Sequence, residues 1–461
     1  GEGDCGACTV VLGERTLAAD GTPGVAYHAI NACIRLAHSI DGMALWTVED
    51  LAADPLLQGP GTADARALHP VQEALVQCHA SQCGFCTPGF AMSLFGMYQN
   101  RICRGETVTR AVAQEDLSGN LCRCTGYRPI LEAAERMAAL PAVTVDEAAL
   151  LRKLEQIAPA APAPEHDFAY ESPPTLAALL QARADRPQAQ LVAGCTDVGL
   201  WVTKQHRRFD AVLDVTRAAE LRRIERTAAG LRIGAAATLQ DAYAALAADR
   251  PQLRAFAARF AGLPVRNSGT LGGNVANGSP IGDSMPLLIA LGAQVVLASV
   301  RGERAMPLEN LYLAYRRTAM AADEIVAWID VPAPTAGERM AVYKVSKRMD
   351  DDISAVCLAL RLELADDGTV RSASVGAGGV AATPVRARAT EAALAGRPWT
   401  AATAAAAGAV LQDEFQPISD MRASAAYRRA VLGNLLQRFW LEGEGLQQVS
   451  LATLVLDEEL A

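Results

Sequence analysis

The sequence has no excess of basic residues and no apolar run long enough to cross a membrane. Its 42 Lys and Arg residues are outnumbered by 51 Asp and Glu residues, which gives a net charge of −9. The longest nearly continuous apolar stretch, residues 285–300, contains Gln294 and is shorter than the ~20 residues that a spanning helix needs. No secretory signal is visible. We therefore expect neither nucleic acid nor a membrane as a partner.

The sequence also lacks the G-x-G-x-x-G fingerprint of a Rossmann nucleotide site. It has two other glycine-containing stretches instead. Residues 190–199 read QLVAGCTDVG, an apolar strand followed by a turn whose backbone N–H groups are able to cradle a pyrophosphate. Taken alone, this is more simply an ordinary strand and turn. Residues 267–274, NSGTLGGN, place two adjacent glycines for close backbone approach beside polar side chains, and Asp283 follows.

Four cysteines form a C-x2-C pair, Cys83 and Cys86, and a C-x-C pair, Cys122 and Cys124. Two such pairs are able to converge on one metal centre. Both [2Fe–2S] clusters and structural zinc use four cysteine thiolates. C-x-C is unusual for a zinc ribbon, and the remaining alternative is a set of buried, inert cysteines.

Three further cysteines follow the plant-type [2Fe–2S] pattern, in which C-x4-C-x2-C precedes a distant fourth cysteine. Cys5 and Cys8 give the C-x2-C pair, and Cys33 is the natural distant ligand. The remaining ligand is expected immediately before Gly1, so we expect this site to be vacant, labile or partial in a chain that begins at Gly1. Cluster-bearing thiols also indicate a reducing compartment, and we predict a cytoplasmic location.

Local patterns predict several elements along the chain. A β-branched run over residues 7–12 predicts a strand, and helices are expected to begin near Pro70, Thr87 and Arg128. Three prolines among alanines in residues 157–164 predict an extended linker. Residues 358–364 alternate like a strand, and apolar residues from Tyr427 to Trp440 recur with helical spacing, which predicts a structural helix.

The two cysteine constellations, in this order and with their flanking residues, resemble the xanthine dehydrogenase and aldehyde oxidase family of molybdenum hydroxylases. The resemblance covers nearly the whole chain and implies a multidomain α+β fold. Its parts would be a truncated β-grasp [2Fe–2S] ferredoxin-like domain (1–60), a helical-bundle [2Fe–2S] domain (61–148), a linker (149–167), an α+β FAD-binding domain of vanillyl-alcohol-oxidase type (168–335) and a C-terminal α+β flavoprotein domain (336–455).

The resemblance also implies the cofactor contacts. The cluster ligands would be Cys5, Cys8 and Cys33 for the first cluster and Cys83, Cys86, Cys122 and Cys124 for the second. The FAD contacts would be Val192, Ala193, Gly194, Cys195, Thr196, Asp197, Val198, Gly199, Phe260, Thr270, Leu271, Gly272, Gly273, Asn274, Asp283 and Lys344. Many relatives carry Asn or Gly at position 195. The loop at 346–352 would border an NAD site, although a charge run of this kind is usually a solvated loop.

By this resemblance the chain is an electron-transfer subunit of a xanthine dehydrogenase. A large molybdenum-cofactor (molybdopterin) subunit would oxidise hypoxanthine and xanthine to urate, with NAD as acceptor, as a dimer of heterodimers. No catalytic residue for the hydroxylation is assignable in this chain. The alternatives are another molybdenum hydroxylase acting on aldehydes or N-heterocycles, a zinc-binding scaffold, and a stand-alone NADH:acceptor reductase. The substrate, the acceptor and the relative potentials of the clusters are not encoded in readable motifs.

Overall fold

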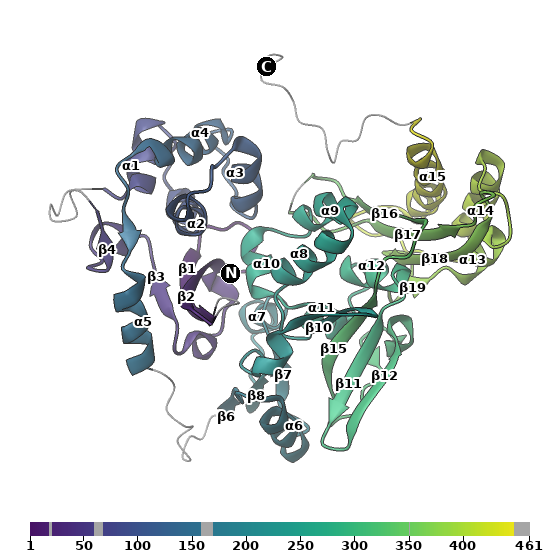
Figure 1. The fold of residues 1–461 in the computed structure, drawn as a ribbon, viewed down its shortest axis with the longest axis horizontal. Coiled ribbons are helices and arrows are strands. Elements are labelled where there is room, and N and C mark those ends of the chain that lie inside the picture. The colour runs from purple at the N-terminus through teal and green to yellow at the C-terminus, as the bar shows by residue number, and fades with distance from the viewer. Residues whose placement is uncertain (18–20, 60–67, 158–168, 350, 447–461) are drawn as a thin grey trace. The chain divides into compact units, whose positions relative to one another are not determined.

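The computed structural model describes residues 1–17, 21–59, 68–157, 169–349 and 351–446 (Figure 1). Contacts between residues divide the chain into two compact units. The N-terminal unit consists of Gly1–Glu171, Gly194–Asp214 and Ala261–Gly269. The C-terminal unit consists of Ser172–Ala193, Val215–Phe260 and the chain from Thr270 onward.

The N-terminal unit begins with a three-stranded antiparallel sheet. Strand β1 (Thr9–Leu17) lies between β2 (Pro23–Asn31) and β3 (Ala44–Trp46), and Thr9 pairs with Asn31 in the register. The strand predicted over residues 7–12 is thus confirmed from Thr9 onward. Alternate residues such as Val11, Val25 and Trp46 turn inward because successive side chains of a strand point to opposite faces.

Five helices share the apolar core of this sheet. They are α1 (Pro70–Gln77), α2 (Thr87–Asn100), α3 (Arg110–Asp116), α4 (Arg128–Arg136) and α5 (Glu147–Gln156). Of these, α2 and α5 pack directly on its strands, while the others pack on neighbouring helices. The predicted helix starts near Pro70, Thr87 and Arg128 are confirmed, and each of these helices has Pro in its first turn, where no N–H is needed. The rings of Trp46 and Phe95 lie 5.8 Å apart, and one core cluster extends from Val11 to Leu154. The two predicted iron–sulfur domains therefore bury one continuous core.

The expected linker 149–167 starts too early, because its first part is helical. Asp146 caps α5 by accepting a hydrogen bond from Ala149 N at 2.9 Å, and Leu150 and Leu154 are buried one turn apart. These apolar residues at i and i+4 spacing stabilise a helix where the proline-rich composition further on suggested extended chain. Residues 158–168, which hold the prolines, lie outside the described residues.

Two segments of the predicted FAD-binding domain, 168–335, pack within the N-terminal unit. The first contains α7 (Val198–Thr203) and β8 (Ala211–Asp214), which pairs in parallel with β6 (Ala169–Glu171), and the second contains α10 (Leu263–Ser268). Helix α10 lies on β2, where Asn267 Nδ2 donates to the carbonyl of Ala29 at 2.9 Å. By their contacts, these two segments group with the N-terminal unit, whereas the rest of residues 172–335 groups with the C-terminal unit.

The C-terminal unit contains a five-stranded antiparallel sheet in the order β12-β11-β15-β10-β9. Its strands are β9 (Ile224–Thr227), β10 (Gly230–Gly234), β11 (Gln294–Ser299), β12 (Gly302–Pro307) and β15 (Ile325–Pro332). The other elements of this part are α6 (Leu176–Asp185), β7 (Gln190–Val192), α8 (Leu239–Asp249), α9 (Arg254–Ala258), α11 (Leu271–Asn277), α12 (Ser284–Ala290), β13 (Tyr312–Ala314) and β14 (Arg317–Thr318). No described helix is long and apolar enough to serve as a membrane span.

A second antiparallel sheet follows, in the order β16-β17-β18-β19. Its strands are β16 (Glu338–Val345), β17 (Val356–Leu364), β18 (Val370–Gly378) and β19 (Val385–Arg386), and its helices are α13 (Arg388–Leu394), α14 (Ala401–Glu414) and α15 (Ala425–Gly443). Both the strand predicted at 358–364 and the helix predicted around 427–440 are confirmed. Val375 and Ala377 pack with the helices, whereas Gly376 lies so close to α12 that an added Cβ would be 2.1 Å from the carbonyl oxygen of Pro286.

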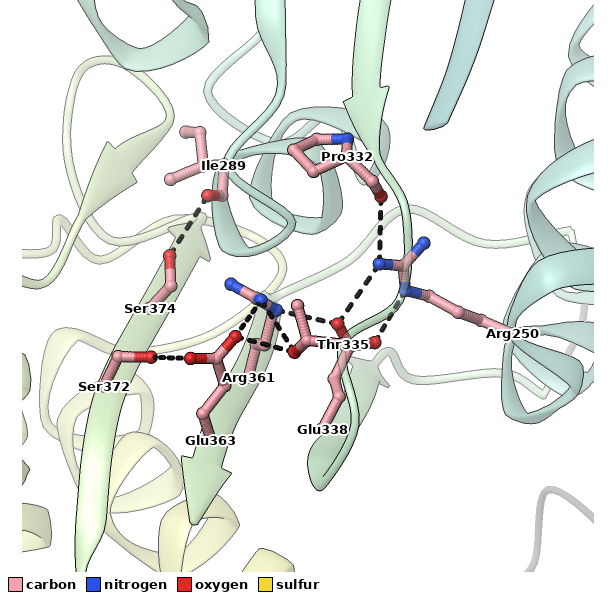
Figure 2. Close-up of polar contacts among 9 residues, drawn as sticks. All are labelled: Arg250, Ile289, Pro332, Thr335, Glu338, Arg361, Glu363, Ser372 and Ser374. Atoms are coloured by element: carbon pink, nitrogen blue, oxygen red, sulfur yellow. Dashed lines mark hydrogen bonds and ion pairs between the residues drawn. The ribbon is translucent and has the colours of Figure 1, made fainter. Parts of the chain in front are cut away.

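A buried ionic network joins the two sheets of the C-terminal unit (Figure 2). Glu338, at the start of β16, accepts from Arg250 Nε at 2.7 Å and from Arg361 Nε at 2.9 Å. Arg250, which follows α8, also donates to the carbonyl of Pro332 at the end of β15. The side chains of Arg250 and Glu338 are only 2% and 5% exposed. Separating the partners of a buried pair would leave uncompensated charges in the interior, which is strongly unfavourable. The network therefore constrains how the two sheets pack.

Candidate cluster and flavin sites

The four thiols of the C-x2-C and C-x-C motifs come together in the N-terminal unit as two contacting pairs. Cys83 and Cys86 precede α2, and Cys122 and Cys124 lie in the loop between α3 and α4. The thiols of Cys83 and Cys124 are in hydrogen-bond contact, and so are those of Cys86 and Cys122. Each pair thus joins one cysteine from either motif, as a shared centre requires.

Hydrogen-bond donors surround the sulfur of Cys122. The N–H groups of Cys124 and Thr125 donate to Cys122 Sγ at 3.4 Å each, and the Thr125 hydroxyl lies 3.1 Å away. Burial raises the pKa of the Cys122 thiol, but these hydrogen bonds outweigh it and lower the pKa to about 7. Burial and the neighbouring Cys122 raise the pKa of Cys86 to about 11. A hydrogen bond from the backbone of Phe85 and the contact with Cys124 also lower the pKa of Cys83. The protein thus favours the thiolate, the form that binds metal, at Cys83 and Cys122.

Two contacting thiol pairs are the arrangement that a binuclear cluster needs. Among the described residues, no group of three or more Cys, His, Asp or Glu side chains is arranged to hold one metal ion. Two thiolates on one tetrahedral ion lie ~3.7 Å apart when each metal–sulfur bond is about 2.3 Å. A [2Fe–2S] cluster needs two such pairs, one for each iron, whereas structural zinc needs four ligands around one point. The residues present fit a [2Fe–2S] cluster.

The first thiol group lies at the N-terminal end of β1. The thiols of Cys8 and Cys33 are in hydrogen-bond contact, with Cys5 nearby, and burial raises the pKa of Cys8. A Cβ atom added to Gly1 would lie 2.8 Å from Cys33 Sγ. A residue placed directly before Gly1 would therefore start beside this thiol group, which is the position that the plant-type pattern requires for its first cysteine.

The loops that carry the two thiol groups touch through their backbones. The N–H of Leu121, next to Cys122, donates to the carbonyl of Cys5 at 3.0 Å. Gly6 has a φ of 68°, and an added Cβ there would lie 2.3 Å from the carbonyl oxygen of Gly119. Only glycine allows this approach, so the two loops are in direct contact.

The predicted flavin turn is divided between the two units. Val192 and Ala193 belong to the C-terminal unit, and Gly194 to Gly199 belong to the N-terminal unit. Cys195 has a φ of 61°, which is left-handed and costs roughly 1–2 kcal/mol for most side chains. This conformation explains why Asn or Gly suits position 195. Burial and, to a lesser extent, the carboxylate of Asp214 raise the pKa of the Cys195 thiol to about 12.

In the C-terminal unit, the last part of the second glycine stretch, residues 270–274, forms the start of α11. Thr270 caps the helix by accepting from Gly273 N at 3.0 Å, and Leu271 is fully buried. An added Cβ on Gly272 would lie 2.3 Å from Cβ of Ala235. The side-chain oxygen of Asn274 is buried and has no hydrogen-bond partner among the described residues. A buried acceptor without a partner is unfavourable by itself, so Asn274 fits a role in holding a polar group of FAD.

Asp283 and Lys344 form a buried ion pair with each other. Lys344 Nζ donates to Asp283 Oδ2 at 2.7 Å, and the Ser354 hydroxyl donates to Oδ1 at 2.6 Å. Their side chains are 5% and 4% exposed. Phe260 is also buried, with its ring 5.2 Å from that of Tyr243. The charges of Asp283 and Lys344 therefore compensate each other, and a contact with FAD stays a prediction for these residues.

Arg259, at the C-terminal end of α9, holds the loop that follows β16. It donates to the carbonyls of Lys344 and Met349 at 3.1 and 3.0 Å. Nothing in the spacing of the sequence singled out Arg259, because its partners lie some 90 positions away. The same loop lines one side of a pocket of about 270 Å³, hereafter the loop pocket. The residues that line it are Lys347, Asp352, Ile353, Ala355, Met421 and Arg422. Asp350 lies outside the described residues.

Comparison with known protein families identifies three segments. Residues 47–135 match the "[2Fe-2S] binding domain", residues 166–334 the "FAD binding domain in molybdopterin dehydrogenase" and residues 341–443 the "CO dehydrogenase flavoprotein C-terminal domain". The fold and the thiol pairs thus define an iron–sulfur flavoprotein with the multidomain α+β fold that the sequence predicted.

Known relatives place it within one family. The chain is 30% identical to xanthine dehydrogenase of Emericella nidulans, over 95% of this chain and 35% of the relative. A chain in the structure of carbon monoxide dehydrogenase from Hydrogenophaga pseudoflava superimposes with a TM-score of 0.56 and 29% identity, over 59% of this chain and 96% of that one. A chain of quinoline 2-oxidoreductase from Pseudomonas putida 86 gives 0.55 and 26%, over 62% and 99%. The protein belongs to the molybdenum hydroxylase family, and it spans about a third of the length of the curated relatives.

Proposed function

We propose that the chain is the electron-transfer subunit of a xanthine dehydrogenase. It would connect a large molybdenum-cofactor subunit, the site of hypoxanthine and xanthine oxidation to urate, with NAD. When bound, two [2Fe–2S] clusters and FAD supply the single-electron and hydride chemistry. The observation that supports this most is the backbone contact between the loops carrying the two thiol groups, through Leu121 N and the carbonyl of Cys5. Electron transfer between two clusters requires that they lie close together. Two structural metal sites that act independently have no such requirement.

The surface around the second thiol group supports a partner subunit at this face. Cys83 and Cys124 are exposed. The apolar side chains beside them are exposed as well: Phe85 is 78% exposed, Leu121 38% and Tyr127 37%. Apolar side chains around a redox centre fit burial under another protein. We assign this face to the large subunit, with two such heterodimers per complex, in the reducing environment of the cytoplasm that free cysteines favour.

The loop pocket is our candidate for part of the NAD site. Lys347 and Arg422 supply cationic groups for a pyrophosphate, and Ile353 and Met421 supply apolar surface. Burial raises the pKa of Asp352, but hydrogen bonds from the N–H groups of Arg348 and Ile353 outweigh this effect. The pKa of Asp352 is therefore lowered, and its carboxyl group stays ionised. About 270 Å³ lies near the lower end for ligand pockets and has room for part of a dinucleotide. Lys347→Met should weaken NAD reduction while purine-to-dye turnover stays unchanged, and equal loss of both would contradict the assignment.

The decisive experiment counts iron, sulfide, flavin and zinc, with a visible spectrum, in two forms of the chain co-expressed with its large subunit. One form begins at Gly1, and the other carries a cysteine directly before Gly1. We expect about two iron in the first form and about four in the second, with one FAD in each. Zinc without flavin in both forms would exclude an oxidoreductase. NADH–dye turnover by the purified single chain would favour a stand-alone reductase.

A second candidate is a molybdenum hydroxylase that acts on an aldehyde or an N-heterocycle. The similarity to quinoline 2-oxidoreductase over 62% of the chain supports it. Substrate-binding residues would lie in the large subunit under either proposal. An activity screen of the assembled complex with xanthine, quinoline and aldehydes distinguishes the two.

A further inference from the structure

A small buried polar network lies where the two thiol-bearing loops of the N-terminal unit meet. Asn120, only 4% exposed, directly precedes Leu121 and Cys122. Its side-chain amide nitrogen donates to the carbonyl of Gly6 and to the hydroxyl of Thr9, each at 3.2 Å. Its amide oxygen accepts from the Ser93 hydroxyl of α2 at 2.6 Å. All of the polar capacity of the Asn120 nitrogen is thus directed at the other loop.

The receiving groups belong to the turn that holds Cys8. The carbonyl of Gly6 accepts from Thr9 N at 3.0 Å and from the Thr9 hydroxyl at 2.6 Å, which closes a tight turn around Ala7 and Cys8. Asn120 adds a third donor to the same carbonyl. Gly6 lies so close to this loop that an added Cβ would be 2.6 Å from the Asn120 amide nitrogen, so Asn120 packs directly on the turn as well as bonding to it.

The orientation of the Asn120 amide is determined by its partners. A carbonyl oxygen such as that of Gly6 only accepts hydrogen bonds, so the nitrogen must face it. The hydroxyl of Ser93 on α2 then donates a hydrogen bond to the amide oxygen of Asn120. A buried polar group with every bond satisfied holds its neighbours in one arrangement, whereas a partly satisfied one does not.

We propose that Asn120 is a positioning residue for electron transfer between the two clusters: it fixes the gap between the Cys5–Cys8 turn and the Cys122–Cys124 loop. The inference rests on the proposed function, because it requires both clusters. Asn120 itself binds no iron and would act only through the two loops. Removing outer groups that orient metal ligands typically costs about 10–100-fold in metal affinity or activity, and we take this as the scale for Asn120.

The test compares three variants in whichever form of the chain, with its large subunit, carries about four iron and one FAD. Asn120→Ala removes both side-chain bonds from Asn120 to the other loop and leaves the backbone bond from Leu121 N to the Cys5 carbonyl. Thr9→Val removes one of the two side-chain bonds, together with the bond from the Thr9 hydroxyl to the Gly6 carbonyl, with little change in shape. Ser93→Ala removes only the bond to the amide oxygen of Asn120. The readouts are iron content, the magnetic splitting between the two reduced clusters by electron paramagnetic resonance, and the freeze-quench rate at which the two signals equilibrate after limiting reductant.

We expect equilibration to slow about tenfold or more in Asn120→Ala, with an altered splitting, to slow less in Thr9→Val, and to stay nearly unchanged in Ser93→Ala. An iron-replete Asn120→Ala with the parent's rate and splitting would overturn the inference, and so would an equal effect of Ser93→Ala. If Asn120→Ala fails to load iron, an iron-replete Thr9→Val with the parent's rate overturns it. A parent that shows no pair of cluster signals in either form refutes the proposed function itself, and the inference with it.

Discussion

In the N-terminal unit the predicted ligand Cys122 has hydrogen-bond donors directed at its sulfur, and the predicted ligands Cys83 and Cys124 are exposed. In the C-terminal unit the two predicted charged contacts, Asp283 and Lys344, are buried and bound to each other. The difference follows from where the chemistry resides. A cluster is held by side chains, whose type the sequence displays. A flavin is held in good part by backbone N–H groups and by approach distances, so the conspicuous charged residues nearby are free to serve the scaffold.

Replacing one thiol ligand should give the largest effect. Cys86→Ser is expected to remove the second cluster, about two iron per chain, because its four ligands act together. Iron analysis and the visible spectrum measure this. Cys78→Ser is the matched control, since Cys78 lies nearby in sequence but outside both thiol groups. Full iron in Cys86→Ser would show that the thiol pairs do not form one centre.

Breaking the buried ion pair should destabilise the C-terminal unit next most strongly. Lys344→Met leaves Asp283 as an uncompensated buried charge, and we expect a loss of about 3–5 kcal/mol in the free energy of unfolding. Urea unfolding followed by fluorescence measures it. The double variant Asp283→Asn, Lys344→Met should recover part of the loss, because the two sites are coupled.

A control for this prediction lies in the loop pocket. Lys347→Met changes the same residue type at an exposed position, and we expect an effect within about 0.5 kcal/mol. If Lys344→Met proves as mild as this control while flavin is lost, Lys344 serves the cofactor rather than the scaffold, and the contrast between the two units disappears.

The N-terminal unit also contains a buried titratable group, His69. Its protonation provides a pH test of how burial affects stability in this unit, for comparison with the buried ion pair of the C-terminal unit. His69 Nδ1 caps α1 by accepting from Val71 N, and burial lowers the His69 pKa to about 3, below the unfolded value near 6.5. Below pH 6.5 the unfolded state therefore takes up a proton that the folded state refuses. The free energy of unfolding therefore decreases as the pH falls below 6.5, by about 2 kcal/mol between pH 6.5 and 5.

Unfolding of the chain at pH 7.5 and pH 5 checks this expectation. His69→Asn keeps a capping acceptor but does not titrate, so its stability should fall less over the same interval. Parallel loss in the parent and in His69→Asn would assign the acid sensitivity to carboxylates instead.

The smallest effect is expected at Cys195. Glycine would relieve the left-handed backbone by about 1 kcal/mol. The lost packing of a buried thiol offsets this, so we expect Cys195→Gly to change the free energy of unfolding by less than about 1 kcal/mol. Flavin content should stay the same, because a turn that works through its backbone needs no side chain at this position. Cys195→Val should cost about 1–3 kcal/mol, since a β-branched side chain is strained there. Loss of flavin in Cys195→Gly would mean that the thiol itself takes part.

The sequence by itself predicted seven candidate ligands and located the main elements, including α2, β17 and α15, because ligand type, proline position and apolar periodicity are local properties. It also identified the glycine stretch at α11, where close approach excludes other residues. It placed the linker too early, since the apolar pair Leu150 and Leu154 needs the neighbouring core to stabilise α5.

Only the tertiary structure decided which groups meet. Which thiols pair, whether Asp283 is free or bound to Lys344, and why Asn120 is buried between two loops all depend on residues between 25 and 114 positions apart in the chain. No local pattern encodes such separations. The energy of a buried polar group depends on the partners that folding brings to it, and for Asn120 and Asp283 those partners give the residue its role.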